Sequence, residues 1–130
     1  MSFLSKWEPQ LLSVLRIVVG LLFLEHGMSK IFHFPVAAMP GPLPPMILAA
    51  GIIELVGGAL LVLGLFTRIA AFIASGEMAA AYWLVHVHMG SYIFPVINKG
   101  DLAILFCFVF LFIAAAGAGP WSIDAAMKKS

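Results

Sequence analysis

Four apolar runs, each about as long as a bilayer is thick, most constrain what this chain can fold into. We place them at about 10–32, 46–66, 69–89 and 102–118. About 20 helical residues, at 1.5 Å each, cross the ~30 Å hydrocarbon layer. Lipid accepts only helices and closed barrels, because every backbone group must be satisfied internally. The sequence therefore predicts an all-α integral membrane four-helix bundle, a single domain over residues 1–130.

Composition supports a membrane protein and excludes several functions. Of the 130 residues, 63% are hydrophobic and 10% are charged, whereas soluble domains average about 45–50% apolar and about 25% charged residues. A net charge of +1 provides no basic surface for nucleic acid. The one cysteine, Cys107, excludes an intrachain disulfide and dithiol chemistry within this chain. The first run is too long for a signal peptide, and no small-x-small cleavage site follows it.

Lysine and arginine predict the orientation, because they favour cytoplasmic loops. An even number of spans puts Lys6, Arg68, Lys128 and Lys129 on one side of the membrane and Lys30 and Lys99 on the other. We therefore expect a multi-pass protein of the bacterial inner membrane with both termini in the cytoplasm. The connectors at 33–45, with five prolines, and at 90–100 would then face outward.

Three charged residues lie deep in the predicted spans: Arg16, Glu54 and Glu77. Such groups cost several kcal/mol at mid-bilayer and are usually paired or functional. We predict that Arg16 contacts at least one of the two glutamates. One interpretation is a structural salt bridge that sets helix register. The other is a polar pocket in which the second carboxyl group makes a proton-relay candidate.

Helical periodicity indicates which residues face the bundle interior. At about 100° per residue, one stripe of the first span holds Arg16, Gly20, Phe23, Gly27 and Lys30. In the third span, Glu77 shares a stripe with His88, and His86 lies opposite. We therefore predict a polar pocket near the outer leaflet, bordered by His26, Lys30, Glu54 and His88.

The four histidines fall near the outer ends of the first and third spans, at His26, His33, His86 and His88. One hypothesis is zinc or copper held by His26, Glu25 and the H-x-H pair; another is a b-type haem between helices. Residues two apart on a helix point about 200° apart, which disfavours a joint site. A metal or haem is therefore the weaker interpretation, and interfacial histidines are the stronger one.

These residues, taken in order, resemble the DoxX family of small four-helix membrane proteins. The matching pieces are R-x3-G-x2-F-x3-G-x2-K from Arg16 to Lys30, then "GIIELVGGALLVLGLFTRIAA", "NKGDLAIL" and "GAGPWSID". Lys99 and Asp101 depart from the Asn-Gly-Gly-Glu that begins the family's last helix. The resemblance covers nearly the whole chain.

The resemblance implies a membrane subunit linked to quinone chemistry. Relatives accompany thiosulfate oxidation that reduces quinone, quinone or catechol resistance, or antioxidant and sulfur-transfer enzymes. Our leading hypothesis is a quinone-binding subunit of an oxidoreductase system, with no redox centre of its own. Glu54, Glu77 and His26 are the catalytic candidates, and the candidates to contact quinone are Arg16, Lys30, His88 and Phe23. The alternatives are a scaffold for redox or sulfur-transfer partners, and a small-molecule or proton-coupled transporter, which would need a homo-oligomer.

Overall fold

A computed structural model describes residues 2–89, 93–95 and 100–127. The long helices are α2 (Glu8–Phe32), α3 (Pro45–Leu63), α4 (Thr67–Ala81) and α7 (Asp101–Ala116). A π-helical turn, η1 (Tyr82–His86), and α5 (Val87–Met89) extend α4, and short helices α1 (Ser2–Ser5) and α8 (Ile123–Ala126) lie near the termini. Within the described ranges there is no strand.

The predicted all-α membrane fold is confirmed. Three helical segments, α2, α3 and α4 with η1, are long and apolar enough to cross a membrane by length and composition. The fourth, α7, is apolar but has 16 residues, which reach about 24 Å at 1.5 Å per residue. Of the positive residues used to predict orientation, Lys99, Lys128 and Lys129 lie outside the described residues.

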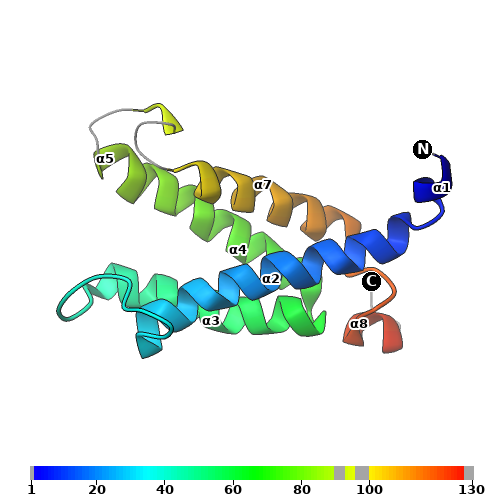
Figure 1. Cartoon of the computed structure of the whole chain (residues 1–130), viewed down its shortest axis with the longest axis horizontal. Helices are drawn as coiled ribbons and strands as arrows, with labels where there is room; N and C mark the ends of the chain where they lie inside the picture. Colours follow the sequence, from blue (N-terminus) through cyan, green and yellow to red (C-terminus); the bar gives the residue numbers. More distant parts are fainter. Residues whose placement is uncertain (1, 90–92, 96–99, 128–130) are drawn as a thin grey trace.

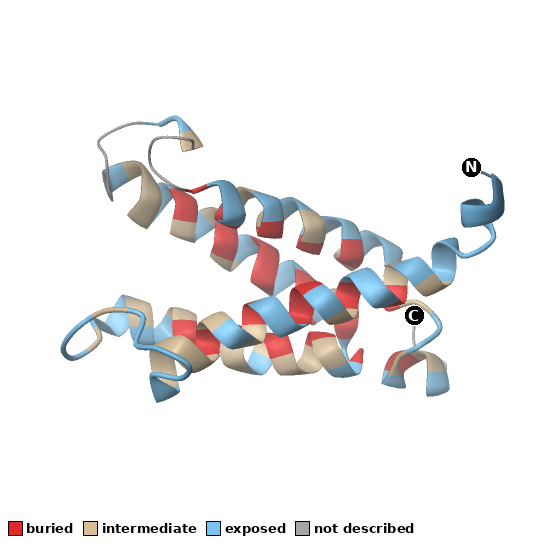
Figure 2. Cartoon of the chain, in the orientation of Figure 1, coloured by how far each residue is buried: buried red, intermediate tan, exposed pale blue. Residues whose placement is uncertain are grey.

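The four long helices form two pairs that spread apart like a V. Helix α2 packs along α3, and α4 packs along α7, while the pairs meet mainly through α3 and α4. Figure 1 shows the pairs converging near the two chain termini and diverging toward the connector at 33–44. We call the converging end the closed end and the diverging end the open end. Buried residues follow the inner faces of both pairs (Figure 2).

Glycines allow α2 and α3 to pack closely. A Cβ added to Gly58 would lie 2.6 Å from the backbone nitrogen of Leu24. A Cβ added to Gly27 would lie 2.8 Å from the Cα of Leu55. Since these neighbours are backbone atoms, only glycine permits the observed approach, as is common between helices in lipid.

Arg16 lies at the closed end, and the predicted contact with Glu54 or Glu77 is wrong. The Arg16 side chain is 0% exposed and donates hydrogen bonds to three backbone carbonyls, those of Leu61 (2.8 Å), Trp121 (2.7 Å) and Ala118. The last carbonyls of a helix have no intrahelical partner, and a guanidinium supplies five donors. Arg16 therefore satisfies the end of α3 and the chain beyond α7 rather than a carboxylate.

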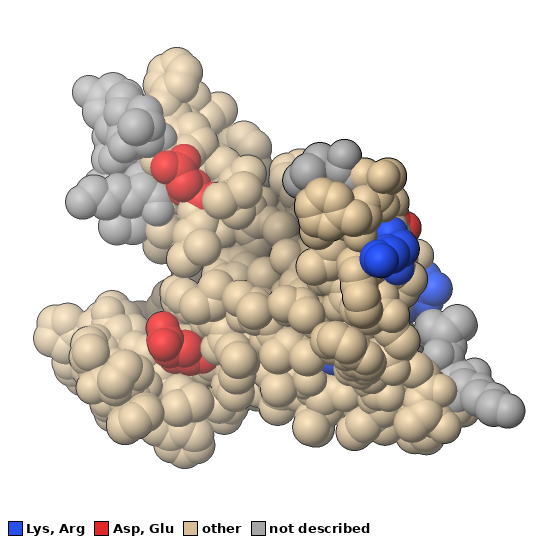
Figure 3. Space-filling view, turned by 45° about the vertical axis from the view of Figure 1, so that its right-hand side comes forward, with Lys and Arg blue, Asp and Glu red and all other residues tan. Residues whose placement is uncertain are grey.

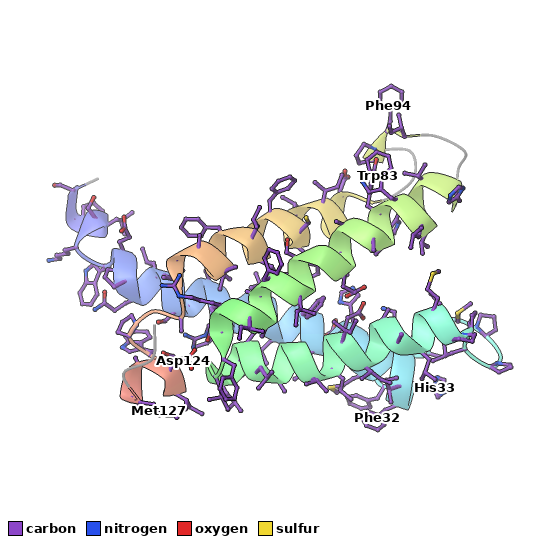
Figure 4. The ribbon with its side chains drawn as sticks, turned by 180° about the vertical axis from the view of Figure 1, so that it is seen from behind. Phe32, His33, Trp83, Phe94, Asp124 and Met127 are labelled. Carbon is purple, nitrogen blue, oxygen red and sulfur yellow. The ribbon has the colours of Figure 1, made fainter. Side chains whose placement is uncertain are left out.

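The C-terminal segment 117–127 is bonded to the start of α4 at the closed end. Asp124 accepts hydrogen bonds from the backbone nitrogens of Phe66 (3.0 Å) and Thr67 (2.9 Å) at the start of α4, where unpaired N–H groups favour an anion. Arg68 donates to the carbonyls of Ala114 (3.2 Å) and Ala115 in the last turn of α7. Figure 4 labels Asp124 at this end, far from His33 at the open end.

Candidate functional site

A cavity of about 500 Å³ lies between the two helix pairs toward the open end, and Figure 3 shows the molecule hollowed between its two arms. Most of its lining is apolar, including Phe23 and Phe106. The polar lining comes from five side chains: His26, Lys30, Glu54, Glu77 and His86. A largely apolar cavity with a few convergent polar groups is typical of a small-molecule site.

Lys30 and Glu54 form an ion pair inside this cavity. The Lys30 Nζ lies 2.6 Å from Glu54 Oε1, and the side chains are 18% and 2% exposed. Lys30 is in the last turn of α2, and Glu54 is near the middle of α3. The close approach at Gly27, one turn before Lys30, brings the two side chains together. The charge of the lysine is therefore offset inside the cavity by a carboxylate of α3.

Glu77 adds a second carboxyl group from the other helix pair. It lies against the carboxyl group of Glu54 and close enough to Lys30 to be attracted by it. Its Oε1 is buried and has no hydrogen-bond partner among the residues that the structure describes. We call Lys30, Glu54 and Glu77 the charged cluster. It holds two carboxyl groups and one ammonium group, so its charges do not balance unless a proton is bound.

His26 lies beside the charged cluster with one ring nitrogen already occupied. The His26 Nδ1 is 2.7 Å from the carbonyl oxygen of Leu22, and because a carbonyl can only accept, Nδ1 carries the proton. In the neutral ring, Nε2 is then the acceptor. The ring packs edge-on against Phe106, with centroids 5.9 Å apart. His26 can therefore exchange a proton at Nε2 while its orientation is held.

The position predicted for His88 is wrong, because His86 faces the cavity instead. His88 is exposed and is not part of the lining, whereas His86 is half-buried and lines the cavity. The cause is the turn Tyr82–His86, which is π-helical. A π turn contains one extra residue, so the residues after it are rotated by about 100° relative to a regular α-helix.

The structure thus brings together five of the seven predicted site residues, which are Phe23, His26, Lys30, Glu54 and Glu77. Arg16 and His88 lie elsewhere. His86 is the residue that the periodicity missed, and no sequence signal for a π turn precedes it. Over the described residues, no group of three or more His, Cys, Asp or Glu side chains is placed to hold a metal ion.

Comparison with known proteins gives the chain's relatives. The family model of DoxX matches residues 11–87. An uncharacterized protein of Haemophilus influenzae is 47% identical over 128 residues, which cover 95% of this chain and 96% of that protein. An uncharacterized membrane protein of Mycobacterium tuberculosis is 30% identical over 139 aligned positions, covering 93% of this chain and 83% of that protein. No solved structure matches the chain.

Proposed function

Because the chain belongs to the DoxX family of membrane proteins, we propose that it is a quinone-binding subunit of an oxidoreductase system, with the headgroup held in the cavity. One observation carries the proposal: a buried carboxyl oxygen of Glu77 that has no hydrogen-bond partner among the described residues faces a largely apolar cavity beside an ion pair. A buried polar atom of this kind is costly and is expected where a ligand completes the hydrogen bonding.

The residues present suit a quinone headgroup. Each ring carbonyl needs a donor, and the Lys30 ammonium group has three, so it can supply one beside its bond to Glu54. A quinol needs proton acceptors, and the Glu77 carboxyl group and His26 Nε2 can serve. A cavity of about 500 Å³ also falls within the range of small-molecule sites.

A bound quinone supplies two-electron redox chemistry, and the protein's own residues bind it, orient it and move protons. Lys30 pairs with Glu54, which leaves Glu77 and His26 as the groups placed to exchange protons with the ring. Reduction of the quinone would take two electrons from a redox or sulfur-transfer partner and two protons through Glu77 and His26. Oxidation of the quinol would return the protons to these residues and pass the electrons to the partner. A transporter is the poorer alternative, since Arg16 and the C-terminal segment obstruct the bundle at the closed end.

We further propose that both termini lie in the cytoplasm, in the bacterial inner membrane, so that the cavity faces the outer leaflet. Among the described residues, Lys6 and Arg68 lie at the closed end with the termini. Lysine and arginine near the ends of the spans favour the cytoplasmic side.

The test is calorimetric binding of a short-chain quinol analogue to the protein in detergent micelles. We expect Glu77→Gln and His26→Ala each to weaken binding by about tenfold or more, because hydrogen bonds to charged groups contribute about 1.5–3 kcal/mol. Glu25→Gln is the matched control, since Glu25 is exposed on α2 beside His26. Unchanged affinity in both variants would remove this site. No binding by the wild type, together with intact partner assembly, would favour a scaffold.

A further inference from the structure

The cavity is closed on one side and open on the other. Between α2 and α7, aromatic rings fill the space: Phe106 packs edge-on against Phe23, with centroids 5.7 Å apart, and against His26 at 5.9 Å. The lining from α3 and α4 includes four alanines, Ala49, Ala50, Ala80 and Ala81, together with larger aliphatic side chains such as Ile53. No phenylalanine, tyrosine or tryptophan of these two helices lines the cavity, so this side lacks the ring barrier found between α2 and α7.

Two of these alanines lie where the cavity meets the lipid-facing surface. Ala49 and Ala80 line the cavity and are nevertheless exposed. Ala49 shares a helix face with Val56, seven residues away, and Ala80 shares one with Ile73. Val56 and Ile73 are more than half exposed, as expected of residues that contact lipid chains. The gap between Ala49 and Ala80 therefore opens sideways toward lipid.

The charged cluster excludes an anionic ligand. Its ammonium group is already bound by Glu54 at 2.6 Å, and a second carboxyl group, that of Glu77, lies beside this pair. An anionic headgroup such as a phosphate or a fatty-acid carboxylate would add an anion to a cluster whose one cation is already paired. Like charges at such distances are strongly unfavourable where water is scarce. The site therefore favours an uncharged headgroup that can both donate and accept hydrogen bonds.

The cluster also lies deep in the membrane. Glu54 is nine residues into α3, about 14 Å along the helix at 1.5 Å per residue, so a headgroup bound there sits well inside the hydrocarbon layer. A ligand that arrives from lipid reaches this depth directly, with its tail remaining among the lipid chains. A tail confined to the cavity would instead have to share the space with the headgroup.

We propose that the gap between Ala49 and Ala80 is a lateral portal through which an uncharged, tail-bearing ligand reaches the charged cluster while its tail extends into the bilayer. The inference rests on the proposed function for the headgroup's chemistry. It adds the route by which the ligand enters, the position of its tail, and the two residues that border this route.

The portal is tested in phosphatidylcholine nanodiscs with two benzoquinones that share one ring, one tailless and one with a ten-carbon tail. Ala49→Trp combined with Ala80→Trp fills the portal, and Val56→Trp combined with Ile73→Trp is the matched control on the same helices. We expect the portal variant to slow association of the tailed ligand by about tenfold or more. Association of the tailless ligand, which can enter from the open end, should change by less than about twofold. The control should leave both unchanged.

A second measurement locates the tail and does not depend on how the tryptophan variant folds. A tailed quinone with a photoreactive diazirine at its chain end should label the portal faces of α3 and α4 in the wild-type protein. Labelling on α2 and α7 instead, or unchanged association in a folded portal variant, would overturn the portal. Competition by oleate would overturn the preference for an uncharged headgroup. If neither quinone binds the wild type, the proposed function itself fails; if the tailless one binds and the portal results are negative, only this inference fails.

Discussion

Replacing Lys30 by methionine tests the charged cluster most directly. Methionine keeps the unbranched apolar stem of lysine and removes its charge. In the wild type, the ammonium group lies 2.6 Å from a Glu54 carboxylate that is 2% exposed. Removing one partner of a buried ion pair typically costs about 3–5 kcal/mol, because the remaining charge is left without compensation. We therefore expect Lys30→Met to destabilise the protein strongly at neutral pH.

Proton uptake by Glu54 limits how much stability Lys30→Met can lose. A carboxylate stranded beside Glu77 in a low-dielectric site takes up a proton rather than staying charged. Holding a proton on an ordinary carboxyl group at pH 7 costs roughly 4 kcal/mol. The expected loss at pH 7 is therefore about 3–4 kcal/mol, at the lower end of the range for buried pairs.

The stability of Lys30→Met should depend on pH more strongly than that of the wild type. Folding of the variant takes up one proton more than folding of the wild type, so the free energy of unfolding of the variant falls more steeply as pH rises. The slope is about 1.4 kcal/mol per pH unit, so between pH 7 and pH 5 the variant should regain about 3 kcal/mol relative to the wild type. At pH 5 the loss should thus shrink to about 1 kcal/mol.

The assay is reversible unfolding by dodecyl sulfate in mixed micelles, followed by circular dichroism at pH 5 and pH 7. Lys6→Met is the matched control, because Lys6 is exposed, and it should change stability little. Adding Glu54→Gln to Lys30→Met should restore most of the loss and abolish the extra pH dependence. A single variant that is as stable as the wild type at pH 7, or equally destabilised at both pH values, would refute the reasoning.

Three further predictions concern the rest of the fold. Arg16→Met should lower the free energy of unfolding by about 3 kcal/mol or more, because it removes three hydrogen bonds donated by a charged group; a loss below about 1 kcal/mol in the same unfolding assay would contradict this. Gly58→Ala should destabilise the protein, because the new Cβ meets backbone at 2.6 Å, whereas Gly57→Ala, with its nearest atom a ring carbon at 3.5 Å, should be neutral or stabilising by up to about 1 kcal/mol. In an otherwise cysteine-free chain, an impermeant maleimide should label Pro42→Cys on intact cells but Ser5→Cys only after permeabilisation, and the reverse pattern would turn the cavity mouth toward the cytoplasm.

The lengths of the apolar runs were enough to predict the fold, and helical periodicity was enough to predict much of the cavity. Both predictions rely on regular α-helical geometry, which α2 and α3 keep without interruption. The stripe containing Phe23, Gly27 and Lys30 does face the interior, because α2 is a regular helix of 25 residues. Glu54 and Glu77 likewise occupy the positions that face the other helices.

Two predictions were wrong because they depend on features that regular helical geometry does not predict. The partners of Arg16 depend on where α3 ends and on the return of the chain after α7, so they are known only from the tertiary structure. Carbonyls at the end of α3 and in the chain after α7 take the place of the expected carboxylate. The exchange of His88 for His86 depends on one extra residue in the π turn, which shifts every later position on that helix.

Charged residues have different partners at the two ends of the molecule, and this difference supports the ligand site proposed at the charged cluster. At the closed end, Arg16, Arg68 and Asp124 satisfy carbonyls and amides at helix termini, which lipid would otherwise leave unpaired. Glu54 and Glu77 lie in mid-helix, where the backbone groups already bond one another. A buried ion pair is often replaceable by apolar residues without loss of stability, and even the pair with Lys30 leaves Glu77 in excess. Packing alone therefore gives no reason for a second carboxyl group in this cavity, whereas a ligand that exchanges protons does.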